Sequence, residues 1–345
     1  MTVGLLSMAH YLPSRVVTTP ELAASFRDAS GKQVIGARAL QRLTGVRERR
    51  WAAIDEYSSD LAGQATTKAL DRSNLRSEDV DLLIFASASH DVAEPATANR
   101  LQVLTGCSNA RVLDVKNACN SFLDGLDVAK AMIDLGRVRN AVVATGEVIS
   151  PFVSLQVPTG EDPMSLLAGL TLGDAGAAAV LVPASDECLA TLGQGFFLTF
   201  GEHWDVSRIM AGGSMRGRQY DEAYFWSDSA KILGLAIEHV PTVVKQALEA
   251  ADWTPADVDL VVPHQASVRV IQSICAASGI PFERCVVTAE HLGNTAAASI
   301  PVALSIALER GLPAECHRAL LVGGAAGFSA AAVPLTLTGA HCESL

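Results

Sequence analysis

The sequence predicts a layered α/β fold built from two similar halves. Residues 68–84 resemble residues 246–262 at an offset of 178 positions, and residues 139–144 resemble residues 318–323 at an offset of 179. Each half shows the same order of patterns: a helix, a short acidic turn, an apolar strand, a helix rich in glycine and alanine, and another apolar strand. A repeat of this length indicates two copies of one α/β unit related by a pseudo-twofold axis.

Individual elements follow from local patterns. Apolar runs without polar alternation predict strands at residues 82–86, 141–144 and 260–262. Such runs are typical of strands that helices cover on both faces of a sheet. Buried helices are predicted to start near Ala118 and near Ala296, which the offset makes equivalent, and we expect them to lie side by side at the axis.

The N-terminal half is expected to span residues 1–183 and the C-terminal half residues 184–345. The second half contains residues 319–340, an uncharged run of 22 residues that is long enough to cross a bilayer. This run is interrupted by Gly323, Gly324, Gly327 and Pro334, and its pieces have the length of strands. We therefore expect two buried strands joined by a glycine turn, and no membrane segment.

The composition excludes several classes of protein. Of the 345 residues, 49% are hydrophobic and 18% are charged, so the chain is not disordered. The formal net charge of −11 argues against nucleic-acid binding and against adhesion to an anionic membrane. The cysteines lack the paired spacings of a zinc site or a disulfide framework, and the N-terminus has no secretory pattern. A cytoplasmic location is the expectation. The cysteines are Cys107, Cys119, Cys188, Cys275, Cys285, Cys316 and Cys342.

Cys119 lies where the apolar strand that ends near Val115 gives way to a helix that runs through Met132. The unpaired N–H groups and the dipole at a helix N-terminus stabilise a thiolate and lower the pKa of a cysteine. Because the thiolate is the nucleophilic form, we predict that Cys119 is a nucleophile with a lowered pKa. A single cysteine is more often an inert core residue, and this alternative stays open here.

Two segments of the second half carry polar residues at the ends of predicted elements. His264 follows the strand at residues 260–262, and Asn294 precedes the helix that starts near Ala296. A neutral imidazole can take the proton of a thiol or polarise a thioester carbonyl, and a carboxamide can donate to the same oxygen. Each residue alone has an ordinary interpretation, as a structural histidine or a helix cap.

With these residues the sequence resembles the thiolase superfamily, specifically ketoacyl-acyl carrier protein synthase III and its relatives. The resemblance covers nearly the whole chain, from the Tyr-Leu-Pro segment at residues 11–13 to the glycine turn that ends at residues 327–328. In that family the cysteine of an Ala-Cys-x-x-Phe pattern accepts the acyl chain, and His-Gln-Ala and Gly-Asn-Thr motifs supply two further catalytic residues. These motifs correspond here to Cys119, His264 and Asn294.

The resemblance implies a five-layered αβαβα thiolase-like fold, a homodimer, no metal ion and no cofactor. The substrates would be thioesters of coenzyme A or of the phosphopantetheine of an acyl carrier protein. It also implies an oxyanion hole formed by the N–H groups of Cys119 and Gly327. Asn120 and Phe122 are expected to line the substrate tunnel. Lys116 and Asn117 stand where the family has small residues, which predicts a different pocket entrance.

A Glu-Pro-x-Thr-Ala segment begins at Glu94. This segment resembles the branch of the family that joins two acyl thioesters, which includes olefin-pathway head-to-head condensing enzymes and pyrone-forming ketosynthases. In those relatives the glutamate enters the active site of the neighbouring subunit and acts as the base. A base is needed because no decarboxylation generates the carbanion, and a desolvated carboxylate can take an α-proton. The alternative is a solvated acid that caps the next helix.

The resulting hypothesis is an acyltransferase of secondary metabolism that joins a Cys119-bound acyl group to a second acyl or β-ketoacyl thioester by a non-decarboxylative Claisen condensation. Three alternatives stay open: decarboxylative condensation with malonyl carrier protein, acyl transfer to a hydroxyl or amine, and an inactive partner chain. Arginines are expected to contact the phosphopantetheine or an acidic carrier protein, although a solvated surface explains them equally well. These are Arg208, Arg216, Arg218 and Arg269.

Overall fold

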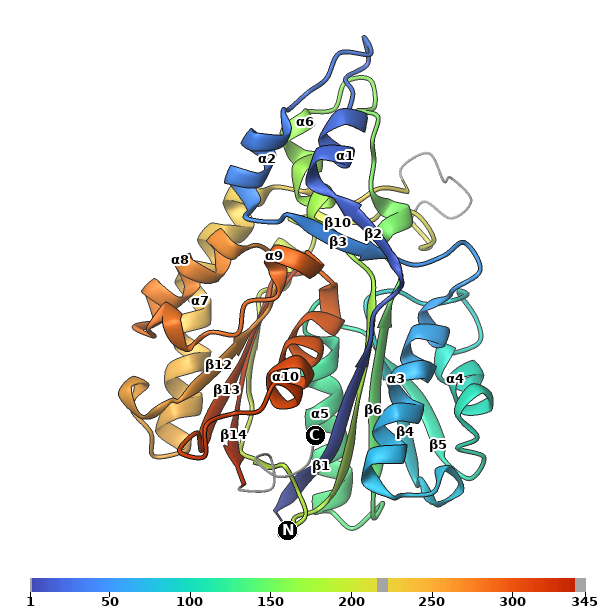
Figure 1. Ribbon diagram of the computed structural model, residues 1–345, viewed down its shortest axis with the longest axis vertical. Coiled ribbons are helices and arrows are strands. Elements are labelled where there is room, and N and C mark those ends of the chain that lie inside the picture. The colour runs from blue at the N-terminus through green and yellow to red at the C-terminus, as the bar shows by residue number, and fades with distance from the viewer. Residues whose placement is uncertain (1, 216–222, 339–345) are drawn as a thin grey trace.

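The main strands of each half form a continuous run within one large sheet of the computed structural model, which describes residues 2–215 and 223–338 (Figure 1). Two pairs of short strands form separate small sheets. The strand order is β12-β13-β14-β8-β1-β7-β6-β4-β5, and β9 pairs with β14. In this sheet, the strands of the first half therefore run together from β1 to β5, and those of the second half lie on the other side of the β8–β1 contact. The boundary expected at residue 183 coincides with the end of β7, and the division into two domains stays a prediction.

The strands and helices of the two halves have the following bounds. The N-terminal half contains β1 (Val3–Tyr11), α3 (Ser58–Ser73), β4 (Leu82–Ala86), α4 (Thr97–Thr105), β5 (Arg111–Val115), α5 (Ser121–Asp134), β6 (Ala141–Glu147) and β7 (Ala175–Pro183). The C-terminal half contains β8 (Ala190–Leu192), β9 (Phe196–Thr199), α7 (Ser229–Ala250), β12 (Leu260–Pro263), α8 (Val268–Ser278), α9 (Ala289–Leu292), α10 (Ser299–Glu309), β13 (Arg318–Ala325) and β14 (Ser329–Leu337).

Five layers follow from the way each strand divides its side chains. In β4, Leu83 and Phe85 pack against α3 and α4, whereas Leu82 and Ile84 share a core cluster with α5 and α10. The strands of the second half divide their side chains in the same way, between α7 and α8 on one face and the central helices on the other. This two-sided burial explains why the strands lack polar alternation, and it confirms the predicted αβαβα fold.

Backbone geometry shows the repeat most directly. Asn74 and Asp252 both have a φ of 56°, and Ala118 and Ala296 have φ values of 48° and 45°. Each pair is 178 residues apart, and few residues other than glycine adopt this left-handed conformation. The central helices α5 and α10 begin three residues after these two alanines, later than predicted. In the second half, a short 3₁₀ turn at Ala296–Ala298 fills the interval.

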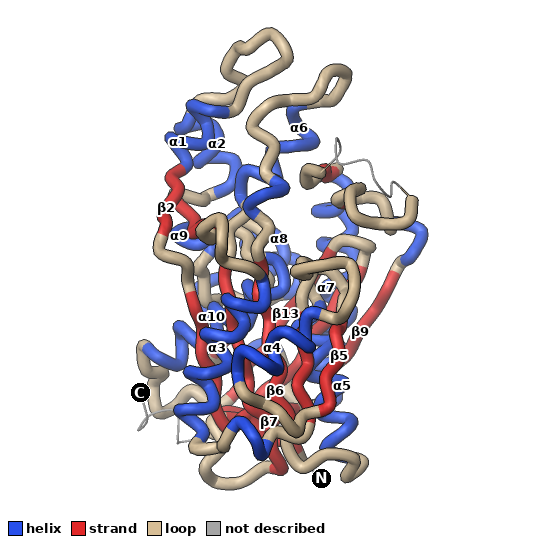
Figure 2. The backbone as a smooth tube through the Cα atoms, turned by 90° about the vertical axis from the view of Figure 1, so that its right-hand side faces the viewer, coloured by secondary structure: helices blue, strands red, loops and turns tan. Residues whose placement is uncertain are grey.

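Smaller elements form a cap above the end of the sheet at which Cys119 lies (Figures 1 and 2). Its core contains Phe26, Leu40, Leu167 and Leu170. The cap comprises β2 (Arg15–Thr18), α1 (Thr19–Ser25), α2 (Ala37–Thr44), β3 (Glu48–Trp51), α6 (Pro163–Leu166), β10 (Ser207–Arg208) and β11 (Trp226–Ser227).

The uncharged run at residues 319–340 forms most of β13 and all of β14, joined by the glycine turn as predicted. Its last two residues lie outside the described part of the chain. Within residues 2–215 and 223–338, no helix is long and apolar enough to cross a membrane.

Helix α3 lies so close to the sheet that Gly146 has no room for a side chain. A Cβ atom there would overlap the carbonyl oxygen of Ser58. Because an added methyl group in a filled interior forces the backbone apart, we expect Gly146→Ala to lower the free energy of unfolding by about 3 kcal/mol.

Chemical denaturation measures this effect, and Gly234→Ala is the matched control. Gly234 lies on the exposed side of α7 with no atom within 4 Å of the added Cβ. That substitution should raise the free energy of unfolding by about 0.5–1 kcal/mol. Equal effects of the two substitutions would contradict the close approach of α3.

Candidate active site

One large cavity of about 1000 Å³ lies beneath the cap, and residues from both halves line it. Its wall includes Cys119, His264 and Asn294, so the fold brings together the three residues singled out from the sequence. Cys119 follows β5 and His264 follows β12, both at the carboxyl ends of parallel strands. Ligand sites of layered α/β proteins form at such ends.

Cys119 lies in the connection from β5 to α5, two residues before the first residue of the helix. The backbone N–H of Ala326 and the N–H of Cys119 itself both donate toward the sulfur. Burial nevertheless raises the pKa of Cys119 to about 12, and the negative charge of Glu147 adds to this rise. The predicted lowering of this pKa is therefore wrong: the helix begins too late to offset desolvation and a nearby carboxylate.

Glu147 is a buried acid that the sequence interpretation missed. It ends β6, is fully inaccessible to solvent, and has no ion-pair partner in the described part of the chain. One carboxylate oxygen accepts from the N–H groups of Ala88 (2.7 Å) and Ala297 (3.3 Å). The other accepts from the N–H (3.0 Å) and the hydroxyl (2.7 Å) of Ser89. Burial still raises the pKa of Glu147 to about 7. The available signal was an acid directly after an apolar strand.

His264 is held in a neutral form. Its backbone N–H donates to the carbonyl of Val322 (2.8 Å), which extends the pairing of β12 with β13. Its Nδ1 lies 2.6 Å from the hydroxyl oxygen of Ser299, and burial lowers the pKa of His264 to about 4. Because a serine hydroxyl can donate or accept, Nε2 can serve either as a base or as a donor.

Asn294 is anchored across the contact between the halves. Its backbone N–H donates to Thr171 (2.8 Å), and its carbonyl accepts from Gly173 (2.9 Å). Its side-chain oxygen accepts from the N–H of Ala296 (3.0 Å). This leaves the side-chain NH₂ group of Asn294 as the donor for a bound oxygen in the cavity.

The glycine turn differs from the expectation by one residue. Its N–H that donates toward Cys119 belongs to Ala326, and Ala326, not Gly327, lines the cavity. Gly327 has a φ of 121°, a conformation that favours glycine, so its role is to form the turn. The structure thus places the N–H of Ala326, and not that of Gly327, beside Cys119.

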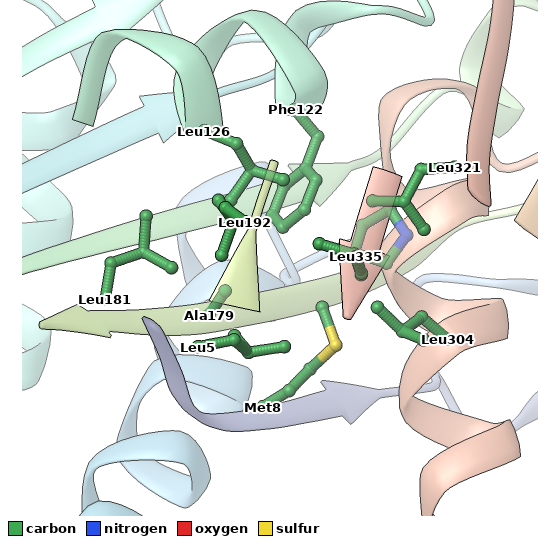
Figure 3. Close-up of a pocket in the computed structure, with 11 residues that line it drawn as sticks. Leu5, Met8, Phe122, Leu126, Ala179, Leu181, Leu192, Leu304, Leu321 and Leu335 are labelled. Atoms are coloured by element: carbon green, nitrogen blue, oxygen red, sulfur yellow. The ribbon is translucent and has the colours of Figure 1, made fainter. Parts of the chain in front are cut away.

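Asn120 and Phe122 do not line the cavity, which corrects the expected tunnel residues. Asn120 is buried, and its side-chain NH₂ donates to the hydroxyl of Ser329 (2.9 Å). Phe122 points into a separate apolar void of about 10 Å³ among leucines of the central layer (Figure 3). The first turn of α5 directs these side chains into the contact between the halves, away from the cavity.

Two of the remaining candidates line this cavity. Arg208 and Arg269 line it, and the guanidinium of Arg208 stacks over Trp226 at 3.9 Å. Glu94 is exposed and does not line the cavity of its own chain. The other two candidate arginines, Arg216 and Arg218, lie outside the described residues. Within the described ranges, no group of three His, Cys, Asp or Glu side chains could hold a metal ion.

Removing the charge of Glu147 should make the Cys119 thiol more reactive. With Glu147→Gln we expect the rate of Cys119 alkylation by iodoacetamide to rise several-fold at pH 8–9, because the pKa of Cys119 falls and more thiolate forms. Below about pH 6 the two rates should converge, since Glu147 with a pKa of about 7 is then protonated in the unmodified protein as well.

Asp174→Asn is the control for loosened packing. Asp174 is also fully buried, and it accepts from the N–H groups of Ala52, Ile149 and Ser150, but it does not raise the pKa of Cys119. Equal acceleration by both variants would show that loosened packing, and not the charge of Glu147, controls the thiol.

Two family models match the chain. The model of 3-oxoacyl-[acyl-carrier-protein] synthase III matches residues 113–194, and the model of its C-terminal part matches residues 248–337. The beta-ketoacyl-[acyl-carrier-protein] synthase III of Paramagnetospirillum magneticum is 32% identical over 329 residues, which are 94% of this chain and 96% of the relative. The enzyme of the same name from Dinoroseobacter shibae is 33% identical over 88% of this chain and 89% of its own.

Solved structures agree with these sequence relatives. The synthase III FabH of Pseudomonas aeruginosa PAO1 has a TM-score of 0.85 and 27% identity, with 98% of this chain and 99% of that chain covered. Cerulenin-bound OleA of Xanthomonas campestris has a TM-score of 0.86 and 25% identity, with 97% of each chain covered. The chain belongs to the 3-oxoacyl-acyl carrier protein synthase III family of thiolase-fold condensing enzymes and is thus an acyltransferase.

Proposed function

We propose that the enzyme joins two acyl thioesters by a non-decarboxylative Claisen condensation. Cys119, His264 and Asn294 are its catalytic residues in this proposal, and Glu94 of the partner subunit is the base. The observation that carries the proposal is the position of Glu94: it is exposed and has no hydrogen-bond or ion-pair partner among residues 2–215 and 223–338. Its loop starts at Ala88 in the cavity wall and is exposed from Val92 to Pro95.

The surroundings of Glu94 favour a homodimer in which this glutamate reaches the other subunit. Strand β5 is the last strand of the sheet and offers an unpaired edge. Close to Glu94 in the chain, Val92, Val103 and Leu104 are exposed by 52%, 80% and 44%. A free sheet edge beside exposed apolar residues is typical of a homodimer interface. In such a dimer the loop of one subunit can reach the cavity of the other.

Acylation uses the neutral thiol and imidazole. Cys119 attacks the carbonyl carbon of the first thioester, and its proton passes to Nε2 of His264 and then to the departing carrier thiol. The N–H groups of Cys119 and Ala326 stabilise the negative charge that develops on the carbonyl oxygen. The product of this half-reaction is an acyl group on the sulfur of Cys119.

Condensation follows when a second thioester enters. Its carbonyl oxygen accepts hydrogen bonds from the side-chain NH₂ of Asn294 and from Nε2 of His264. Glu94 of the partner subunit removes the α-proton, and the carbanion attacks the acyl carbon on Cys119. The carbon–sulfur bond breaks, the Cys119 sulfur leaves with the electron pair, and the proton held by the glutamate restores the thiol. A β-ketoacyl thioester is released.

Decarboxylative condensation is the second candidate, and the names of the curated relatives favour it. In that reaction the loss of CO₂ from a malonyl group generates the carbanion, and His264 and Asn294 serve the same roles. No base is required, so Glu94 would have no catalytic function.

Carriers are proposed to deliver both thioesters past Arg269, which is exposed at the cavity and has no ion pair among the described residues. Its guanidinium suits a phosphopantetheine phosphate or an acidic carrier protein.

The Glu94→Gln variant separates the two reactions. We expect it to lower condensation of two acyl thioesters by at least about a hundredfold, because a carboxamide cannot accept the α-proton. Acylation of Cys119, measured by intact-protein mass spectrometry, should persist. Glu187→Gln is the matched control, because Glu187 is an exposed acid in the loop between β7 and β8. This variant should behave like the unmodified protein. Full turnover of Glu94→Gln together with CO₂ release from malonyl substrates would establish the decarboxylative reaction instead.

Mixed dimers test whether Glu94 acts across the subunit contact. Cys119→Ser and Glu94→Gln proteins are each expected to be inactive. Random exchange of subunits should restore about a quarter of the unmodified activity, because half of the dimers then contain one complete site. No recovery after verified subunit exchange would rule out the action of Glu94 in the partner subunit.

A further inference from the structure

The charged groups on the cavity wall are mostly positive, although the chain as a whole is acidic. Asp91 is the one acid among the described residues that line the cavity. Its carboxylate already accepts from the N–H (3.1 Å) and hydroxyl (2.6 Å) of Ser59, and it lies 3.5 Å from Arg100. The cations on the wall therefore have no free acidic partner there.

Lys116 is the cation nearest to Cys119 in the chain. It lies directly after β5, its side chain lines the cavity, and no carboxylate among residues 2–215 and 223–338 forms an ion pair with it. The other cations have separate positions in the second half. Arg208 stacks on Trp226 and donates to the carbonyl of Asp205, and Arg269 belongs to α8.

His90 lies beside Lys116 on the same wall, with 3.3 Å between Nζ of Lys116 and Nδ1 of His90. Burial and the neighbouring lysine lower the pKa of His90 more than the carboxylates of Asp114 and Asp91 raise it, which favours the neutral ring. A neutral ring that accepts from lysine at Nδ1 carries its proton on Nε2. The pair thus offers an ammonium group and an imidazole N–H, and no carboxylate among residues 2–215 and 223–338 accepts a hydrogen bond from either group.

We propose that Lys116 and His90 form a subsite for a carboxylate, so that one substrate is an acyl thioester whose acyl chain ends in a carboxyl group. This inference deepens the proposed function and rests on it, because the acyl chain must be carried by Cys119. Lys116 is only three residues from Cys119, so the Cα atoms of the two residues are at most about 11 Å apart. That position suits the far end of a short acyl chain.

An anion at this position has two possible sources: a carboxylate on the acyl chain, or a phosphate on the carrier. Thioesters of N-acetylcysteamine separate them because they carry no phosphate. The experiment compares Cys119 acylation by the succinyl and butyryl thioesters of N-acetylcysteamine, which have equal chain length and differ in the terminal carboxylate. Mass spectrometry of the intact protein gives both rates, and their ratio is the readout.

We expect the unmodified enzyme to favour the succinyl thioester. Lys116→Met should lower the succinyl-to-butyryl ratio by about tenfold to a hundredfold, the usual effect of losing a hydrogen bond to a charged group. Lys116→Arg should retain most of the ratio. Lys245→Met is the matched control, because Lys245 is an exposed lysine of α7 outside the cavity. It should leave the ratio unchanged.

The proposal is overturned if the ratio is the same in Lys116→Met and the unmodified enzyme. It is also overturned if Lys116→Met affects only thioesters of coenzyme A, since the anion would then be a phosphate. Binding of the same thioesters to the Cys119→Ala protein gives a second readout that needs no acyl transfer. Selective loss of succinyl binding there, without any acylation of the intact enzyme, would preserve the subsite and reject the proposed function.

Discussion

The contact between the two halves is the constraint on which the site depends. Each key group on one side is held by a partner on the other: Cys119 by Ala326, Asn294 by Thr171 and Gly173, and Glu147 by Ala297. Helices α5 and α10 share one core cluster behind these groups. A small shift of one half would therefore alter every distance in the cavity at once, which makes the central layer part of the catalytic apparatus.

Burial keeps the thiol of Cys119 and the imidazole of His264 uncharged in the resting site. The thiol of Cys119 and the imidazole of His264 are both neutral near pH 7, and of these three buried groups Glu147 is the one with a pKa of about 7. In the proposed reaction, negative charge develops on the carbonyl oxygen of a bound thioester, where the N–H groups of Cys119 and Ala326 already point. In a cavity of low polarity, preorganised donors of this kind stabilise a transient anion more than they would in water.

Much of the fold was predictable because a strand that is buried on both faces has an uninterrupted run of apolar residues. The strand at residues 82–86 was predicted with its correct bounds, since both of its faces are covered and no polar residue interrupts it. The meeting of Cys119, His264 and Asn294 at one cavity was predictable from the repeat, which places the ends of equivalent elements near one axis. The cap was not predicted as a unit, because its pieces come from four separate stretches of chain.

The errors at the site arose from three-dimensional detail. The pKa of Cys119 depends on burial and on Glu147. Glu147 lies 28 residues away in sequence, and only the folded chain brings it close to Cys119. Phe122 was assigned to the tunnel, yet the first turn of α5 rotates it into the central layer. The turn donor was misplaced by one residue because the sequence does not reveal which N–H of a glycine turn faces inward.

Ala297 occupies in the second half the place that Cys119 occupies in the first, one residue after the paired left-handed alanines. Its side chain has no reactive atom, but its backbone N–H supports the carboxylate of Glu147 beside the thiol. The two halves thus share the same main-chain path at this point but differ in role. The first half bears the reactive sulfur, and the second half supplies a structural hydrogen bond beside it. Asymmetry in such an inherited pair can arise through side-chain exchange alone, with the ancestral architecture intact.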